Sequence, residues 1–252
     1  MRIKIVMILC IWGVSYSYAK EKVSPILKIA GQYLEVPYVE RTLEQSGEER
    51  LVVNKKAVDC TTFVEYVLAE YLANDSISFE ERLQSIRYRK GKIEGYTSRL
   101  HYFSEWVQQA INRGYLMDVT EKNSSFKNHL NLYFMSAHPD LYPSLSKEQK
   151  GLDEILQIER ELSGQVFYYL PKEEIATEGI EWIKEGDLIA LVSSIDGLDV
   201  SHLGFAVYVN DELRLLHASS KDKKVIIDTQ SLKDYLMDKK SILGLRVFRV
   251  QL

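Results

Sequence analysis

The sequence DCTTFVEYVLAEYL, residues 59–72, has the pattern of a helix that is buried along one side. Its apolar side chains repeat at helical spacing: Phe63, Val64, Val67, Leu68, Tyr71 and Leu72. Asp59 stands at the N-cap position and Asn74 follows the last apolar pair, as is typical of helix ends. The pattern therefore predicts a buried helix whose first residue is Cys60.

A cysteine at the first position of a helix has unusual electrostatic surroundings. The first backbone N–H groups have no partner inside the helix, and together with the helix dipole they favour an anion such as a thiolate. The dipole contributes roughly 0.3–1 kcal/mol, up to about 2 kcal/mol when partly buried, which is less than two pKa units. We therefore expect a nearby imidazolium to complete the activation of Cys60, which would then alkylate unusually fast at pH 6.

The N-terminal residues have the features of an export signal. Basic residues precede an apolar stretch at residues 5–14, and the small residues Ser17 and Ala19 then form a signal-peptidase site. We expect residues 1–19 to be removed on export to a periplasm, and Leu9 disfavours lipidation of Cys10. The exported chain then keeps Cys60 as its one thiol, with no partner for a disulfide.

The overall composition is that of a folded, acidic protein. The chain has 252 residues, of which 46% are hydrophobic, and its net charge is −4. This composition allows a large core, and the negative charge argues against nucleic acid or anionic lipid as a partner. No apolar run of 18 residues follows the N-terminal segment, so we expect no integral membrane segment in the mature chain, and we assume a monomer.

The periodicity of the chain changes between its two halves. Residues 24–33 and most of residues 78–165 have helical spacing, and the basic run at residues 87–92 is expected to be a solvated face. After Trp182 come short apolar or alternating stretches: residues 187–192, 202–209, 213–218, 225–227 and 242–250. We expect these stretches to form one antiparallel sheet in a single α+β domain, residues 20–252, with residues 78–165 as a helical insertion.

Two histidines in the predicted sheet can be placed by register. If residues 210–211 form a two-residue hairpin turn, Gly204 lies opposite His217. His202 and His217 then project from the same face, as diagonal neighbours with Cβ atoms about 7–8 Å apart, and Gly204 leaves room between them. A thiol, a base and a group that orients the base are the components of nucleophilic acyl transfer.

Cofactor and metal chemistry have weaker support in the sequence. The chain has no His-Glu-x-x-His and no Cys-x-x-Cys motif, and neither a phosphate loop nor a dinucleotide motif follows a predicted strand. Cys60 and the two histidines could in principle hold zinc, but the same residues already have a metal-free explanation. We therefore expect no metal and no cofactor.

Four segments, in order, resemble the motifs of the NlpC-type papain-like cysteine peptidases and amidases of bacterial cell walls: Asp59-Cys60-Thr61-Thr62-Phe63-Val64, Glu185-Gly186-Asp187-Leu188-Ile189, Ser201-His202-Leu203-Gly204 and Leu216-His217-Ala218-Ser219. The resemblance is closer to a branch that is N-acetylmuramoyl-L-alanine amidase-like. Members of this branch have further segments similar to Val36-Pro37-Tyr38-Val39, Leu51-Val52-Val53-Asn54, Thr97-Ser98-Arg99-Leu100-His101-Tyr102-Phe103 and Trp106. Together these segments span nearly the whole mature chain.

The resemblance implies a papain-like core, with the sheet packed on the helix that bears the cysteine. It implies Cys60 as the nucleophile, His202 as the general base and then acid, and His217 as the residue that orients His202. It also places further residues at the oxyanion or substrate site: Tyr38, Asp59, Ser201, Arg99 and His101. For Tyr38 a second oxyanion donor and an ordinary core tyrosine remain equal alternatives.

The function that follows is hydrolysis of the amide between N-acetylmuramic acid and L-alanine in peptidoglycan fragments (muropeptides). An endopeptidase that cuts the stem peptide after D-glutamate needs the same triad, so the sequence leaves this alternative open. A third alternative is a non-catalytic peptidoglycan-binding module. The intact Cys60, His202 and His217 argue against it, because a binding module needs no ionisable thiol.

Overall fold

The computed structural model describes residues 24–44, 47–145 and 149–251. The expected export signal at residues 1–19, with Cys10, lies outside the described residues. Within the described part, no helix is both long and apolar enough to cross a membrane.

A central antiparallel sheet organises the chain. Its strands follow the order β1-β9-β5-β6-β7-β8, and β4 pairs with β9 on the edge opposite β5. The strands are β1 (Leu116–Asp118), β4 (Leu170–Pro171), β5 (Leu188–Ser193), β6 (Val200–Val209), β7 (Glu212–Ser219), β8 (Lys224–Ile227) and β9 (Ile242–Val250). The five strands expected after Trp182 are thus present and antiparallel. A separate pair is formed by β2 (Lys127–His129) and β3 (Val166–Tyr168).

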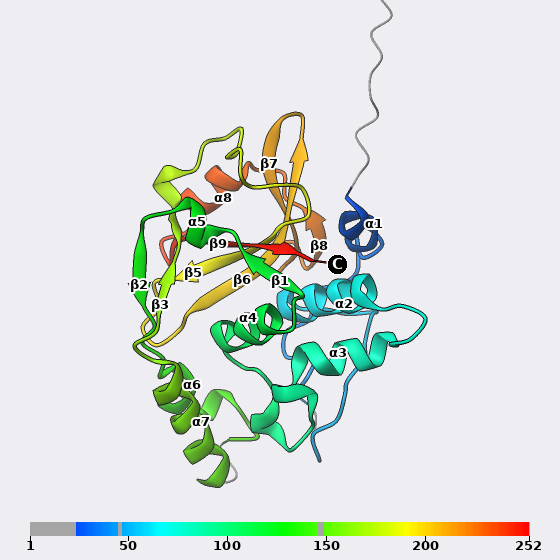
Figure 1. Cartoon of the computed structure of the whole chain (residues 1–252), viewed down its shortest axis with the longest axis vertical. Helices are drawn as coiled ribbons and strands as arrows, with labels where there is room; N and C mark the ends of the chain where they lie inside the picture. Colours follow the sequence, from blue (N-terminus) through cyan, green and yellow to red (C-terminus); the bar gives the residue numbers. More distant parts are fainter. Residues whose placement is uncertain (1–23, 45–46, 146–148, 252) are drawn as a thin grey trace, which may run out of the picture.

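Helices cover both faces of this sheet. The α-helices are α1 (Pro25–Gly31), α2 (Cys60–Leu72), α3 (Phe79–Arg87), α4 (Phe103–Asn112), α5 (Thr120–Asn123), α6 (Phe134–Ala137), α7 (Gln149–Leu162) and α8 (Leu232–Met237). Short 3₁₀ turns are η1 (Arg89–Gly91), η2 (Tyr96–Ser98), η3 (Pro139–Leu141) and η4 (Lys172–Glu174). Figure 1 shows α2, α3 and α4 together on one side of the sheet and α8 away from them, while α6 and α7 extend at one end.

The alternation of side chains along the strands divides the core into two layers. On β6, Leu203 and Phe205 pack in the cluster that contains α2, whereas Ala206 packs in the cluster that contains α8. The α2 sequence supplies more members of the first cluster than any other element, because its apolar stripe is buried from Phe63 to Ala69. The predicted buried helix is therefore confirmed, with Cys60 as its first residue.

The β6–β7 hairpin has the predicted register. Val209 pairs with Glu212 and Phe205 with Leu216, and both turn residues, Asn210 and Asp211, have positive φ. Positive φ at both positions is the conformation of a two-residue turn that matches the twist of the strands.

The role expected for Gly204 is different in the structure. A Cβ atom there would lie 2.8 Å from the Leu215 side chain and 2.8 Å from the Leu216 carbonyl oxygen. Glycine is therefore required by the close approach of β7 rather than by the space between the two histidines.

The middle of the chain is less helical than expected. Helices α3, α4 and α7 lie in residues 78–165, but so do β1 and β2, and β1 extends the central sheet by pairing with β9. Both strands span three residues, which is too short for a period-two pattern to stand out in the sequence.

Candidate active site

Cys60 is held at the start of α2 by a capping box. Asp59 Oδ1 accepts a hydrogen bond from the Thr62 backbone N–H at 2.8 Å, and the Thr62 hydroxyl accepts one from the Asp59 N–H at 2.9 Å. This reciprocal cap fixes the backbone on either side of the cysteine. The Cys60 thiol is free and half-buried, and the backbone of Leu203 on β6 hydrogen bonds to it.

Cys60 and His202 line the same cavity, which has about 480 Å³ of empty space. Its other walls come from α4 with the segment before it, and from the start of β6. The lining residues are Cys60, Thr61, Leu100, His101, Phe103, Trp106, Leu198, Asp199, Val200, Ser201, His202 and Leu203. The cavity thus brings together the nucleophile and base expected from the sequence, with an apolar wall on the α4 side.

The two histidines of the sheet contact each other directly. His202 Nε2 lies 2.6 Å from His217 Nδ1, and the two rings are nearly perpendicular. Tyr235 of α8 packs edge-on against His217, which is 1% exposed. The predicted placement of both rings on one face of the sheet is therefore confirmed.

A β-bulge precedes His202. His202 pairs with Leu191 of β5, whereas Val200 pairs with Val192, so Ser201 is the extra residue. Ser201 is consequently exposed and lies on the cavity wall. Bulges redirect side chains next to active sites, and this one lies where β6 meets the cysteine.

Asp199 joins the start of β6 to α4. Its Oδ2 accepts a hydrogen bond from the Ser104 N–H at 2.7 Å, and its Oδ1 accepts one from the Val200 N–H at 2.8 Å. Burial raises the pKa of this carboxyl above its ordinary value, although these hydrogen bonds oppose the shift. Asp199 thereby caps α4 from outside the helix and positions the strand that carries His202.

The expected resting thiolate is not supported. Burial and, to a lesser extent, the nearby Asp59 carboxylate raise the pKa of the Cys60 thiol to about 12. Burial also lowers the pKa of His202 to about 3, helped by His217 and Lys239. Desolvation disfavours both charged forms and exceeds the helix dipole, so thiol and imidazole are both neutral in the free protein.

Tyr38 lies close to the cysteine. It forms a bridge with Val58 just before the cap, and Cys60 is among the charges that raise the pKa of its phenol, after burial. Tyr38 is half-buried and also lies 5.8 Å from the Lys223 ammonium, measured to the ring centre. The structure therefore places Tyr38 within electrostatic reach of Cys60, whereas Asp59 caps the helix.

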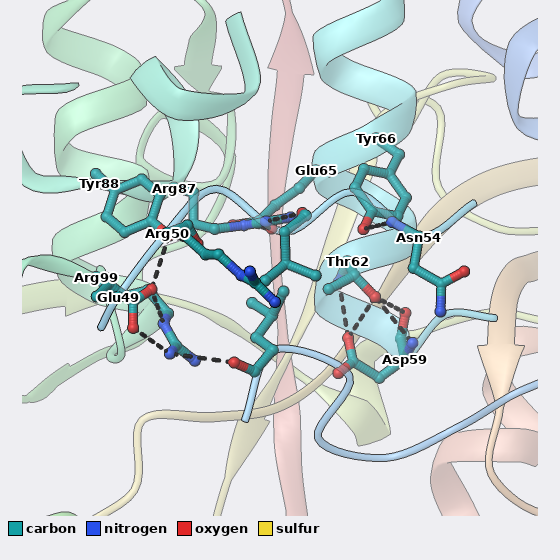
Figure 2. Close-up of polar contacts among 12 residues, drawn as sticks. Glu49, Arg50, Asn54, Asp59, Thr62, Glu65, Tyr66, Arg87, Tyr88 and Arg99 are labelled. Carbon is teal, nitrogen blue, oxygen red and sulfur yellow. Dashed lines mark hydrogen bonds and ion pairs between the residues drawn. The ribbon is translucent and has the colours of Figure 1, made fainter. Parts of the chain in front are cut away.

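Arg99 and His101 go to different places although they are two residues apart. His101 lines the cavity, its Nε2 lies 3.0 Å from the Tyr96 carbonyl oxygen, and burial lowers its pKa to about 3. Arg99 instead forms ion pairs of 2.8 Å with Glu44 and with Glu49, as Figure 2 shows for Glu49. The structure does not bring Arg99 to the cavity.

The basic run at residues 87–92 begins inside the protein rather than on its surface. Arg87 is 1% exposed, pairs with Glu65 of α2 at 2.7 Å, and donates a hydrogen bond to the Val52 carbonyl oxygen (Figure 2). The Tyr88 hydroxyl donates to Glu49. The expectation of a solvated face is therefore wrong for its first two residues, because buried acids face them from other segments.

Asp228 was not foreseen from the sequence. It follows β8 directly, and its Oδ2 lies 3.3 Å from His217 Nε2. Its backbone N–H bonds the Leu215 carbonyl oxygen, which places it diagonally from His217. The missing signal was the length of the turn between β7 and β8, which sets this register.

Among the described residues, no three His, Cys, Asp or Glu side chains are grouped so that they could hold a metal ion.

Comparisons with known proteins identify the family of the chain. The sequence profile of the AmiA-like family, described as N-acetylmuramoyl-L-alanine amidase-like, matches residues 28–244. A structure of an N-acetylmuramoyl-L-alanine amidase from Bacteroides uniformis ATCC 8492 is 44% identical, with a TM-score of 0.88 over 90% of this chain and 99% of that one. A second structure with the same description and source is 46% identical, with a TM-score of 0.88 over 90% of this chain and 98% of that one.

Another similar structure, from Bacteroides fragilis, is described as a xylanase. It is 46% identical, with a TM-score of 0.86 over 89% of this chain and 100% of that one. No curated protein sequence matches the chain significantly. Because the family profile covers most of the chain, the protein belongs to the AmiA-like family of N-acetylmuramoyl-L-alanine amidase-like proteins.

Proposed function

We propose that this protein is a cysteine amidase with an NlpC-type papain-like core, which hydrolyses the N-acetylmuramoyl-L-alanine bond of muropeptides. One observation carries the proposal: Cys60, at the start of α2, and His202, bonded to His217 at 2.6 Å, line one cavity. The family membership supports an amidase acting on cell-wall material. Residues 20–252 would form one catalytic domain, with residues 78–165 as an insertion.

The first chemical step needs no resting thiolate. His202 Nε2 faces His217, so Nδ1 is the nitrogen left for the cysteine. As Cys60 Sγ attacks the amide carbonyl carbon, its proton passes to His202 Nδ1 and the carbonyl oxygen becomes an oxyanion. The charged groups that burial disfavours in the free protein form only as substrate reacts in the cavity. The oxyanion that develops with them lies at the positive end of α2, which stabilises it.

The second step releases the amine. The protonated His202 gives its proton to the leaving nitrogen as the C–N bond breaks, which leaves a thioester on Cys60. Water then attacks the thioester, His202 takes its proton, and that proton returns to the sulfur as the acid leaves. His217 accepts a hydrogen bond from His202 throughout, which keeps the ring oriented.

Two donors are available for the oxyanion. The Cys60 backbone N–H is at the first helical position and has no intrahelical partner, and the Tyr38 hydroxyl lies near the sulfur. Burial and neighbouring acids keep this phenol protonated, so it can donate. Each such donor contributes about 3–4 kcal/mol in related acyl-transfer sites.

The cavity walls suit a muropeptide. Leu100, Phe103 and Trp106 offer an apolar surface for the face of a sugar or its lactyl group. His101 and Ser201 stand on the same wall and offer hydrogen bonds to its polar edge. Arg99 and Asp59 have structural partners and would act only indirectly.

A glycosidase, as described for the Bacteroides fragilis neighbour, has less support in this chain. Glycoside hydrolysis generally uses two carboxylates that flank the bond. Asp199 is the one acid among the residues that line the cavity, and both of its oxygens accept backbone hydrogen bonds.

The experiment uses purified residues 20–252 and its Cys60→Ala variant with defined muropeptides, and the products are weighed by mass spectrometry. We expect a free sugar and an L-alanyl peptide from the wild type, and a loss of at least about 10⁴-fold in the variant at an unchanged Tm. A disaccharide dipeptide would identify a stem-peptide endopeptidase instead. No turnover of muropeptides or whole sacculi by the wild type would overturn the enzyme in favour of a binding module.

Cellular placement follows from the same proposal. A cell-wall substrate requires export, and residues 1–19 would be the signal that directs the protein to the periplasm. Detection of a mature N-terminus at residue 20 in a periplasmic extract would support this; retention of residues 1–19 in the cytoplasm would contradict it.

A further inference from the structure

We propose that Asp228 is a positioning residue which sets the tautomer of His217 and, through it, leaves His202 with its basic nitrogen toward Cys60. The inference rests on the proposed function, in which His202 is the base. It adds Asp228 as a fourth residue behind Cys60, His202 and His217. Neither the sequence motifs nor the family description contain Asp228.

His217 is the more deeply buried of the two histidines. His217 is 1% exposed, and among the described residues no well-aligned hydrogen-bond partner reaches its Nε2. The nearest acceptor is Asp228 Oδ2, at 3.3 Å. A buried N–H strongly prefers a carboxylate to no partner at all, so the proton of neutral His217 belongs on Nε2.

The tautomer of His202 then follows from which ring nitrogens donate and which accept hydrogen bonds. With its proton on Nε2, His217 has only a lone pair on Nδ1, and that atom is 2.6 Å from His202 Nε2. His202 Nε2 must therefore donate, which puts the proton of neutral His202 on Nε2 and leaves Nδ1 as the base. The protein thus prepares the proton acceptor for the thiol before substrate arrives.

The other carboxylate oxygen makes this arrangement testable. Asp228 Oδ1 accepts a hydrogen bond from the Gln230 backbone N–H at 2.9 Å. In Asp228→Asn the amide oxygen keeps this bond, so the amide NH₂ turns toward His217 Nε2. A donor at that place forces the proton of His217 to Nδ1, then that of His202 to Nδ1, where it blocks proton acceptance from Cys60.

An alanine at this position has a different effect. Asp228→Ala removes the acceptor but imposes no donor, so both tautomers become accessible. A purely structural carboxylate predicts the opposite ranking, because asparagine keeps the shape and the Gln230 bond whereas alanine loses both. Asp222→Asn is the matched control, since this exposed aspartate removes the same charge from the neighbouring turn without contacting either histidine.

The experiment combines kinetics with imidazole NMR. Long-range ¹H–¹⁵N spectra of the substrate-free protein should show His202 protonated at Nε2 in the wild type and in Asp222→Asn, and at Nδ1 in Asp228→Asn. With muropeptide, kcat should fall about 10²–10⁴-fold in Asp228→Asn, by less in Asp228→Ala, and KM should change little.

The proposal is overturned if His202 keeps its proton on Nε2 in Asp228→Asn, or if Asp228→Ala is the more damaged variant at equal folded fraction. The spectra are recorded without substrate. A wild type that hydrolyses no muropeptide but shows the expected tautomers would therefore refute the proposed function and leave this inference standing.

Discussion

Two groups of ionisable side chains, one around Arg87 and Arg99 and one at the cavity, are desolvated but behave differently. In the first, which we call the arginine cluster, Arg87 and Arg99 are paired with Glu65, Glu44 and Glu49. In the second, the cavity group, Cys60, His101 and His202 are desolvated without an opposite charge.

The pairing decides the charge state. Burial alone would lower the pKa of Arg87, but the charge of Glu65 outweighs burial and raises it, so the guanidinium stays charged. In the cavity group, hydrogen bonds to Cys60 and the Asp228 charge near His202 oppose desolvation but do not outweigh it, so the pKa shifts favour the neutral forms of both groups. Paired charges can thus fasten one segment to another, whereas neutral, unpaired groups remain free to exchange a proton with a substrate.

The largest expected effect comes from breaking a pair in the arginine cluster. Glu65→Ala leaves the Arg87 charge buried without its partner, which should lower the free energy of unfolding by about 3–5 kcal/mol. Urea denaturation measures this loss, and the folded fraction should keep its kcat. The double variant Glu65→Leu/Arg87→Met should recover most of the loss, because it removes both charges.

A matched control sharpens this test. Glu80 is exposed on the neighbouring helix α3, and Glu80→Ala should change stability by no more than about 0.5 kcal/mol. A loss below about 1 kcal/mol for Glu65→Ala would contradict the view that the pair fastens α2 to α3.

The next effect separates Arg99 from His101. Arg99→Met removes charged hydrogen bonds to Glu44 and Glu49, so stability should fall by about 1.5–3 kcal/mol while KM stays constant. His101→Phe keeps the contact with the Tyr96 ring but removes the imidazole from the cavity wall and its hydrogen bond to the Tyr96 carbonyl oxygen, so KM should rise about tenfold while stability falls by about 0.5–1.5 kcal/mol.

Muropeptide kinetics and urea denaturation on the two variants provide both readouts. A rise of KM in fully folded Arg99→Met would support the substrate-binding role that the resemblance to the family implied for Arg99. An unchanged KM in His101→Phe would remove His101 from the substrate site.

The smallest effect, counted per imidazole and per pH unit, is the response of the cavity group to acid. The pKa of His202 and that of His101 are about 3 when folded, below the ordinary value of about 6.5. The unfolded chain therefore takes up protons first as the pH falls, so the contribution of these two imidazoles to stability is constant above about pH 7 and decreases below about pH 6.5. Each imidazole contributes a slope of about 1.4 kcal/mol per pH unit.

Urea denaturation between pH 7 and pH 5 measures this slope above the range where carboxylates titrate. His101→Phe should have a slope smaller by the contribution of one imidazole. Parallel pH profiles for the wild type and His101→Phe would show that this ring is not held neutral by the fold.

Much of the fold and part of the site could be predicted, because the deciding patterns are local. The apolar repeat and the Asp59 cap predicted α2 with Cys60 at its start, and period-two stretches predicted the main strands. The two-residue turn at residues 210–211 predicted the register that joins His202 and His217. Each of these inferences needs only neighbours within one element or one hairpin.

Other features depend on segments that are distant in sequence. The basic run at residues 87–92 has the composition of a surface segment, and only Glu65 and Glu49, brought from elsewhere, allow Arg87 and Tyr88 to be buried. Asp228 reaches His217 through the pairing of β8 with β7. No local sequence pattern predicted the register of this pairing.

The sequence by itself thus determined the buried helix, the sheet and the pairing of two histidines. The tertiary structure decided which charges are paired, which buried groups are neutral, and which carboxylate lies next to His217 Nε2. The reason is physical: hydrophobic periodicity acts between neighbours along the chain, whereas desolvation and charge pairing depend on everything that surrounds a side chain in space.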